Sequence, residues 1–390
     1  MQDQKINIGI IGLGGAGRAH ARRFRNNSLV GKIVGYDLRD DIPIDQDIQI
    51  ANSTETLLEQ VDAVSICTPD HCHLKDIRTC LRAGKHVLVE KPMVASLDEA
   101  IELKSLLAEH PHQKFAVHHQ MRHAPAFESV SRLVREGTLW RVFYIEANYW
   151  HDMTDRSTRY DDWRAREGQS LIFGHACHPF DLILNIVGSE PTQHSTFLSK
   201  IGFDDYKAEY TSATTVMNFD NGTIAKTHVN SCCVYPQYNN LIVLGDKGTF
   251  VDGVLFKNGK FTKLTDFYGP GKTSIQLNVV EVKIPRRLLS FLFKSYLGTM
   301  NWLASKLMSH PDYGFRHYPM TVYNHDAACQ TMIDNFIDSI ARNTAVLVGF
   351  CDAERVIRIC EEAEKDGLRR MQQTNGKSAQ RITHVENNCE

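Results

Sequence analysis

A glycine-rich turn directly after an apolar strand places the tightest constraint on how this chain folds. Residues 5–11 read KINIGII, a run rich in β-branched residues, and lead into GLGGAG at 12–17. A helical pattern, RAHARRF, follows at 18–24. Strand, glycine turn and helix in this order are the context in which G-x-G-x-x-G binds a dinucleotide. The sequence therefore predicts a nucleotide-binding βαβ unit at its start.

The glycines of this turn have separable roles. The first permits a tight turn, the second lets the backbone approach a pyrophosphate, and the third lets the helix pack on the strand. The N-terminus of the helix then points at the phosphates. The residues expected to bind the cofactor here are Gly12, Leu13, Gly14, Gly15, Ala16 and Gly17.

The next apolar strand, KIVGYD at 32–37, ends in an acid twenty residues after Gly17. A carboxylate at this place accepts both ribose hydroxyls of the adenosine half, so Asp37 favours NAD. Arg39 is a guanidinium able to hold a 2′-phosphate, and NADP therefore stays open as the less favoured cofactor. The other interpretation of Asp37 is a turn residue at a strand end.

Strand and helix patterns continue to alternate up to residue 119. Helices are expected at 54–60, 73–83 and 96–109, and strands at 61–67, 85–92 and 114–119. Alternation at this spacing is typical of a doubly wound parallel sheet, whose ligand crevice lies at the carboxyl ends of its strands. The N-terminal third is thus predicted to be a Rossmann domain.

The second half of the chain has a different pattern. Residues 211–230 form two alternating strands joined by Asp-Asn-Gly at 220–222, a strong hairpin signal, and more strands follow at 241–264. An α/β domain with a large open, mainly antiparallel sheet is expected. Because 390 residues exceed the usual size of one domain, we expect a Rossmann domain at 1–124, a substrate-binding and oligomerisation domain at 125–370, including helices at 326–342 and 352–370, and a mobile polar tail at 371–390.

Charge, cysteines and the N-terminus limit the kind of protein. The formal net charge of −2 gives no electrostatic reason to expect nucleic acid as a partner. The cysteines form no CxxC pair, and no basic-then-apolar leader is apparent, so a cytoplasmic protein with reduced thiols is expected. His71 and His73 flank Cys72, but they lack a second ligand pair, so no metal is expected.

The segment from Pro285 to Met308 stands out in the second half. Its apolar residues recur at steps of three and four among basic ones, which predicts an amphipathic helix too interrupted to span a bilayer. Three uses stay open: packing on its own sheet, contact between subunits, and weak docking on an anionic membrane surface.

Several stretches together resemble the Gfo/Idh/MocA oxidoreductases, the group of glucose-fructose oxidoreductase and inositol dehydrogenase. They are CTPDHCH (67–73), AGKHVLVEKP (83–92), QMRHAPAF (120–127) and VLGDKGTF (243–250). The E-K-P block is the most specific of them. The resemblance implies a two-domain enzyme that transfers hydride, and an oligomer, a dimer or tetramer built through the open sheet.

The resemblance also implies roles for residues around the E-K-P block. Thr68, Pro69 and His73 would line the dinucleotide, and Glu90 would approach its nicotinamide end. Lys91 would be the catalytic lysine, in a Lys-Pro bond that is often cis in relatives. Chemistry supports this lysine independently, because an alcohol gives up hydride only as its oxygen loses a proton, and a nearby cation stabilises the developing alkoxide.

The stretch GQSLIFGHACHPFD at 168–181 departs from the family pattern of an acid, a histidine four residues later, and an aspartate three residues after that. His178 and Asp181 fill the last two places, but Gly174 stands where the acid is expected. We expect His178 to be the general base, since an imidazole titrates near neutral pH. His175 is a substrate-binding or supporting candidate if the backbone is irregular, which Pro179 favours. Asp181 is expected to orient a side chain.

A polar loop, part of 145–167, is expected to carry specificity, as loops over rigid sheets often do. The candidates for binding a phosphate or carboxylate are Arg122, Arg156, Arg159 and Arg164, and those for stacking on a sugar ring are Tyr149 and Trp163.

Together these features predict an NAD(H)-dependent oxidoreductase acting on a secondary hydroxyl or keto group of a sugar, polyol or nucleotide-linked sugar. Cell-surface polysaccharide synthesis is a candidate setting. Two alternatives stay open. One is a glycosidase that oxidises its substrate transiently with bound NAD. The other is a non-catalytic dinucleotide-binding sensor, which the missing acid at Gly174 favours.

Overall fold

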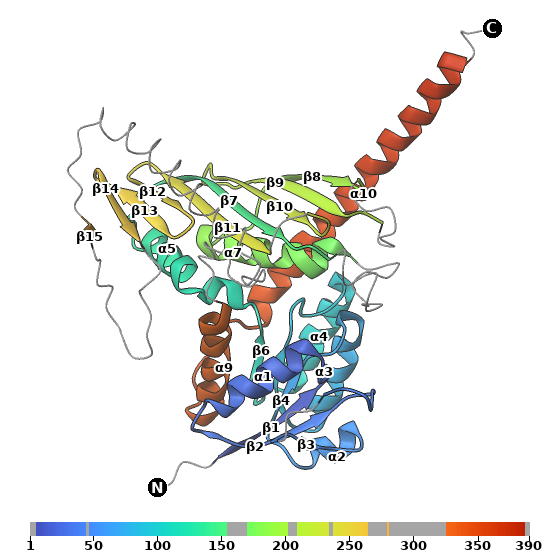
Figure 1. The fold of residues 1–390 in the computed structure, drawn as a ribbon, viewed down its shortest axis with the longest axis vertical. Coiled ribbons are helices and arrows are strands. Elements are labelled where there is room, and N and C mark those ends of the chain that lie inside the picture. Colours follow the sequence, from blue (N-terminus) through green and yellow to red (C-terminus); the bar gives the residue numbers. More distant parts are fainter. Residues whose placement is uncertain are drawn as a thin grey trace, which may run out of the picture.

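The computed structural model describes residues 5–43, 47–153, 170–201, 209–233, 237–263, 279–280 and 325–386. They form two sheets, one after the other along the chain (Figure 1). A Rossmann sheet followed by a large, mainly antiparallel sheet is the architecture that the sequence predicts, and it is confirmed.

The first sheet is parallel throughout. Its strands are β1 (Ile6–Ile11), β2 (Val30–Tyr36), β3 (Gln49–Ile50), β4 (Ala63–Ile66), β5 (His86–Val89) and β6 (Phe115–Val117). They lie in the order β3-β2-β1-β4-β5-β6, and every neighbouring pair is parallel. The strands β2 and β4 lie on opposite sides of β1, so the strand order reverses at this point of the sheet. A ligand crevice is therefore expected at the carboxyl ends of these strands.

The helices of this half lie within a few residues of the predicted ranges. They are α1 (Gly15–Arg25), α2 (Thr54–Leu58), α3 (His73–Arg82) and α4 (Leu97–Glu109), with short 3₁₀ turns η1 (Asp70–Cys72) and η2 (Gln120–His123). Ser53 and Ser96 cap α2 and α4, because each hydroxyl accepts a backbone N–H of the first turn at 3.2 Å. The N-terminus of α1 differs, since Gly14 precedes it and no side chain caps it.

The second sheet is built around β7 (Val142–Trp150). Its other strands are β8 (Gln193–Ser199), β9 (Ser212–Asn218), β10 (Ile224–Asn230), β11 (Tyr238–Gly245), β12 (Gly248–Val251), β13 (Val254–Lys257), β14 (Lys260–Lys263) and β15 (Val279–Val280). The order is β15-β14-β13-β12-β11-β7-β10-β9-β8. Within the second sheet, the β7–β10 pair is the only parallel one among the described strands, and the predicted β9–β10 hairpin is confirmed.

Helices cover one face of this sheet, and on the other face several apolar side chains of the described strands are exposed. A π-helical turn, η4 (Ile172–Ala176), leads into α7 (Cys177–Val187), which packs on β7, and α10 (Phe350–Glu386) packs on β8 and α7 (Figure 1). The helix α5 (Pro125–Arg135) connects the two sheets in sequence. Buried and exposed side chains alternate along the strands, and the exposed set includes Phe143, Phe197, Val216, Ile224 and Phe256.

The helix α9 (His325–Ala341) returns to the first sheet. Its Ile333, Phe336 and Ile337 share one apolar cluster with residues of β1 and α1, and Asn27 donates a hydrogen bond to Asp334 at 2.8 Å. Residue 124 lies between the last strand of the first sheet and the first strand of the second, whereas α9 follows both sheets in sequence and packs on the first. The domain bounds themselves stay a prediction.

The last helix is longer than the sequence pattern indicates. A helix at 352–370 and a mobile tail from 371 are expected, whereas α10 continues to Glu386 and extends beyond the rest of the molecule (Figure 1). The tail lacks apolar periodicity, but eight of the sixteen residues at 371–386 are Met, Gln, Lys, Ala, Arg or Glu, which favour helix. Among the described helices none is long and apolar enough to cross a bilayer. The predicted helix at 285–308 lies outside the described residues.

Candidate active site

The glycine turn has an open surface at the start of α1. Gly12 has a φ of +88°, and a Cβ on Gly17 would lie 1.9 Å from the carbonyl oxygen of Gly12, so the backbone here requires glycine at both positions. A Cβ on Gly15 would meet nothing within 4 Å, and one on Gly14 only the Arg39 guanidinium at 3.8 Å. An uncapped helix N-terminus beside such open backbone fits a pyrophosphate.

Asp37 is fixed at the end of β2 beside this turn. Its carboxylate accepts the backbone N–H of Leu13 at 2.7 Å and that of Arg39 at 3.0 Å, and it pairs with the Arg39 guanidinium at 3.2 Å. Burial alone would raise the pKa of Asp37, but the hydrogen bonds from Arg39 and Leu13 lower it below its usual value. The carboxylate is therefore charged and oriented where the ribose of a dinucleotide is expected.

The loop after β4 is braced against the E-K-P loop. His73 is fully buried, and its ring nitrogens lie 2.8 Å from the Pro92 carbonyl oxygen and 3.0 Å from that of Thr68. The Thr68 hydroxyl donates to Asp76 at 2.7 Å, and Pro69 directly precedes η1. His73 thus holds two loops together, and its contact with a dinucleotide, like that of Thr68 and Pro69, remains a prediction.

Lys91 follows β5 of the first sheet, and its side chain reaches the segment that leads into α7. The Lys91–Pro92 bond is cis, as the resemblance implies. The Lys91 ammonium donates a hydrogen bond to the carbonyl oxygen of Gly174 at 2.7 Å. A backbone carbonyl, not a carboxylate, is therefore the group that this segment presents to the lysine.

The π-helical turn explains why this carbonyl is available. Within η4 the N–H of Cys177 bonds to the carbonyl of Ile172, five residues back. Two residues further on, the same five-residue spacing would pair the Gly174 carbonyl with Pro179, which has no N–H to give. The irregular backbone that Pro179 predicts is thus present, and it leaves a carbonyl for Lys91.

Both histidines of this segment reach one aromatic ring. The ring centroid of Tyr149, on β7, lies 5.5 Å from that of His178 in a stacked arrangement and 5.2 Å from that of His175. A Cβ on Gly174 would meet nothing within 4 Å, so the place of the missing acid is open space. Lys91, His175, His178 and Tyr149 therefore form one cluster, and we name it the Lys91–His178 cluster.

The surroundings of His178 determine the protonation state of its imidazole. Burial, followed by the nearby charges of Lys91 and His119, holds the pKa of His178 well below its usual 6.5. Its Nδ1 makes no hydrogen bond within the described part of the chain. The neutral imidazole, which can accept a proton, is thus the form present at neutral pH.

This pKa gives a pH prediction. The proton-accepting form of His178 should persist as the pH falls through 6.5, so we expect the acid limb of kcat/KM to lie below pH 6.5. The same shift lowers stability in acid, because an unfolded chain takes up the proton below pH 6.5 whereas the buried imidazole resists it. A pH profile of kcat/KM with an acid limb above 6.5 would contradict the assignment.

Arg122 and Asp181 form a buried ion pair beneath the cluster. The Arg122 Nε donates to Asp181 at 2.9 Å, a second nitrogen of the guanidinium also bonds this carboxylate, and a third reaches Asp352 on α10 at 3.1 Å. The Asp181 carboxylate lies 4.0 Å from His119. Asp181 thus bonds the Arg122 side chain, its predicted orienting role stays a prediction, and the guanidinium of Arg122 is occupied by two protein carboxylates.

Other residues near the cluster carried weak signals or none. His119 and His151, whose rings lie 6.4 Å from His178 and 6.0 Å from His175, were not expected there. His119 could have been expected from the sequence, because the two histidines of KFAVHH stand at the carboxyl end of a predicted strand. Arg156, Arg159, Trp163 and Arg164 lie outside the described residues.

Two domains of one protein family, GFO/IDH/MocA, match this chain in succession. Residues 6–119 match the family described as an oxidoreductase family with an NAD-binding Rossmann fold. Residues 127–251 match the GFO/IDH/MocA C-terminal domain. The two matches cover the two sheets in turn.

Individual relatives agree with these matches. The UDP-N-acetylglucosamine 3-dehydrogenase of Acidithiobacillus ferrooxidans is 27% identical over 249 residues, which are 63% of this chain and 74% of that protein. An NADP⁺-dependent scyllo-inositol 2-dehydrogenase of Bacillus subtilis is 26% identical over 156 residues, 39% of this chain and 42% of that protein. The solved scyllo-inositol dehydrogenase of Lactobacillus casei, with bound NAD(H) and scyllo-inositol, shares the fold with a TM-score of 0.69 and 16% identity, over 94% of this chain and 98% of that one.

Proposed function

This chain belongs to the Gfo/Idh/MocA family of oxidoreductases, and we propose that it uses NAD(H) to oxidise or reduce a secondary hydroxyl or keto group of a sugar, polyol or nucleotide-linked sugar. The observation that carries the proposal is the Lys91–His178 cluster, in which an ammonium and a neutral imidazole lie together after β5 and at the start of α7. Similarity to a UDP-N-acetylglucosamine 3-dehydrogenase supports a nucleotide-linked sugar.

In the proposed reaction the bound dinucleotide supplies the hydride acceptor at its nicotinamide ring. The Lys91 ammonium hydrogen-bonds the substrate oxygen and stabilises its developing negative charge. The neutral imidazole of His178 takes the hydroxyl proton as the carbon gives up hydride, so the alcohol becomes a ketone and His178 an imidazolium. In reduction the same two residues act in reverse, and His178 donates the proton.

The cofactor residues make NAD the favoured partner in this proposal. The open backbone at Gly14 and Gly15 would hold the pyrophosphate, and the Asp37 carboxylate would accept ribose hydroxyls. A 2′-phosphate would meet the negative charge of Asp37. Glu90, next to Lys91, would lie toward the nicotinamide end.

Replacing Asp37 by serine tests this preference. We expect Asp37→Ser to weaken NAD binding by about tenfold or more, since one or two charge-assisted hydrogen bonds are lost. The variant should also raise relative NADP affinity, because Arg39 loses its ion pair and becomes available to a phosphate. Binding of both dinucleotides is measured by calorimetry, with Asp41→Ser as the control of equal charge change. Equal NAD affinity in wild type and Asp37→Ser would contradict the assignment.

A substrate screen tests the reaction. The purified protein is incubated with NAD⁺ or NADH and a panel of sugars, polyols and nucleotide-sugars, and both the nicotinamide and the sugar product are measured. One NADH formed per ketone supports the dehydrogenase. Cleavage of a glycosidic bond without net NADH would indicate the transient-oxidation glycosidase. Dinucleotide binding without turnover of any substrate would favour the sensor.

The wider setting also remains proposal. The open face of the second sheet, with Phe197, Val216 and Phe256 exposed, supports a homo-oligomer built through that face. A cytoplasmic location, a role in cell-surface polysaccharide synthesis and weak membrane docking through 285–308 are predictions of the sequence alone.

A further inference from the structure

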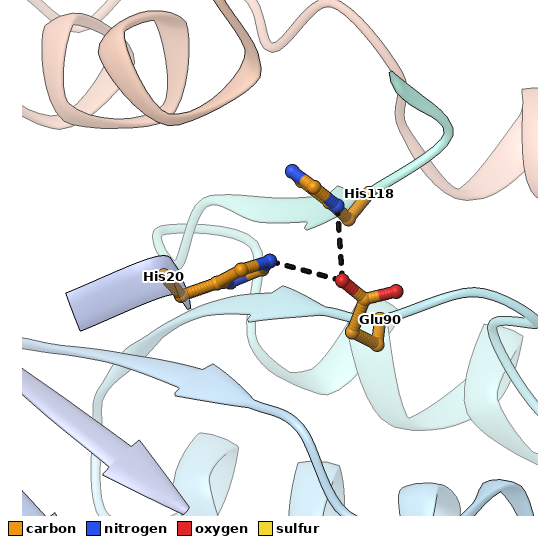
Figure 2. A group of neighbouring side chains, drawn as sticks. All are labelled: His20, Glu90 and His118. Carbon is orange, nitrogen blue, oxygen red and sulfur yellow. Dashed lines mark ion pairs between the residues drawn. The ribbon is translucent and has the colours of Figure 1, made fainter. Parts of the chain in front are cut away.

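Three side chains from separate elements meet behind the E-K-P loop. His20 lies on α1, Glu90 directly follows β5, and His118 directly follows β6. Figure 2 shows both imidazoles beside the same carboxylate oxygen, with His20 Nε2 at 2.9 Å and His118 Nδ1 at 3.0 Å from Oε1 of Glu90. Both histidines are buried, with exposed fractions of 2% and 1%. The proposed hydride transfer uses neither of them.

Hydrogen bonding does not account for this arrangement. Both distances are short enough for a hydrogen bond, but neither ring nitrogen has the direction needed to make one with the carboxylate. His118 hydrogen-bonds to none of the described residues through either nitrogen. A buried imidazole nitrogen that makes no well-directed hydrogen bond is costly, and a bound ion or water is one way to satisfy it.

The spacing of the three donor atoms suits a metal ion. One ligand atom of each residue lies within 4.8 Å of the other two. Zn²⁺ is about 2.0–2.2 Å from imidazole nitrogen and carboxylate oxygen, so tetrahedral neighbours lie about 3.3–3.6 Å apart, a few tenths of an ångström more than the separations of 2.9 and 3.0 Å found here. Donor atoms that lie close together without hydrogen bonds between them are the arrangement expected of ligands around one metal ion.

Neighbouring groups hydrogen-bond His20 and Glu90 so that one atom of each is left to bind a metal ion. His20 Nδ1 lies 2.8 Å from the Ser65 hydroxyl, so a proton on Nδ1 leaves Nε2 free as a ligand. The other oxygen of Glu90 accepts the backbone N–H of Lys91 at 3.2 Å, which leaves Oε1 to face the two imidazoles. Such outer hydrogen bonds are the usual support of histidine and carboxylate ligands.

We propose that His20, Glu90 and His118 form a binding site for one divalent transition-metal ion of the Zn²⁺ class. Two imidazoles and one carboxylate favour such an ion over Mg²⁺ or Ca²⁺, which prefer oxygen ligands. Three protein ligands leave the remaining position to water. The ion would join α1, the E-K-P loop and the end of β6, three segments around the cofactor crevice. This proposal goes beyond the hydride transfer and does not depend on it.

Metal titration of the full-length protein tests the proposal. The purification tag is removed, the protein is freed of metal with chelator, and Zn²⁺ binding is measured by calorimetry and Co²⁺ binding by visible absorption. We expect one equivalent of either ion to bind, and a Co²⁺ spectrum with the intense bands of low coordination number. His20→Ala and His118→Ala should each weaken Zn²⁺ binding at least about tenfold, since loss of an outer partner alone costs that much.

Control variants separate this site from other histidines and from misfolding. His110→Ala, on the loop after α4, removes an imidazole from the same domain and should leave Zn²⁺ affinity unchanged. His118→Asn keeps a polar side chain of similar size where His118→Ala does not fold, as judged by circular dichroism. Zn²⁺ binding by the wild type that equals that of the His20→Ala/His118→Ala variant would overturn the proposal. Because no turnover is measured, that result would leave the proposed dehydrogenase reaction standing.

Discussion

Lys91→Met is expected to lower kcat by about 10²–10⁴-fold for the substrate found by the screen, in both reaction directions. The substitution keeps much of the length and volume of the side chain and removes the ammonium that lies 2.7 Å from the Gly174 carbonyl. Without it no cation offsets the charge that develops on the substrate oxygen. The measurement is steady-state turnover, together with NAD⁺ affinity, which should stay close to that of the wild type.

A neighbouring lysine provides the control for this variant. Lys85 precedes β5, whereas Lys91 follows it, so Lys85→Met makes the same chemical change on one strand at the end away from the cluster. Its kcat should equal that of the wild type. Turnover of Lys91→Met within about threefold of Lys85→Met would remove the lysine from the mechanism, because general acid–base and electrostatic effects are far larger than this.

Arg122→Met is expected to reduce the free energy of unfolding by about 3–5 kcal/mol, the usual result of leaving one partner of a buried ion pair alone. The side chains of Arg122 and Asp181 are 7% and 1% exposed, and Asp181 would keep a negative charge with no cation beside it. The Arg122 guanidinium is also what lowers the pKa of Asp181, against the effect of burial. Urea denaturation followed by circular dichroism measures the loss.

Two further variants make this result specific. Arg122→Met/Asp181→Leu removes the stranded charge as well, and it should be more stable than Arg122→Met alone. Arg141→Met breaks an exposed pair with Asp246, and a change of no more than about 1 kcal/mol is expected. If Arg122→Met were no less stable than Arg141→Met, the buried pair would contribute nothing to the fold.

The first sheet was predictable because its signals are local. Each strand is a short apolar run, and the turn at Gly12 and Gly17 is specified by backbone conformation and by close packing that only glycine allows. The two-residue strand β3 was missed, since two residues show no alternation. The position of α9 on the first sheet was missed as well, because an apolar helix face does not say which sheet it covers.

The site was predictable in part. The E-K-P block and the H-P-x-D segment gave Lys91, His178 and Asp181 as neighbours in function, and Pro179 indicated the irregular turn. The group that accepts the hydrogen bond of Lys91 in place of the missing acid could not be predicted. It is a backbone carbonyl, which every type of residue carries. Arg122 was expected near a substrate anion, but its partners Asp181 and Asp352 lie 59 and 230 residues away in sequence.

Clusters that draw on three elements leave the weakest trace in a sequence. His71 and His73 attracted attention because they flank a cysteine, whereas His20, Glu90 and His118 are spread over 98 residues and meet only when β5, β6 and α1 pack. Parallel strands bring residues at their carboxyl ends to one edge of the sheet. Residues that directly follow such strands are therefore the ones to compare when a site is sought in a chain of this kind.

The most direct measurement is a crystal structure of the protein with NAD⁺ and a substrate or unreactive analogue identified by the screen. The dinucleotide should lie with its pyrophosphate on the backbone at Gly14 and Gly15, and the oxygen that loses its proton should be within hydrogen-bonding distance of both Lys91 Nζ and an imidazole nitrogen of His178. A dinucleotide bound away from the glycine turn, or a substrate oxygen that contacts neither side chain, would contradict this account of the enzyme.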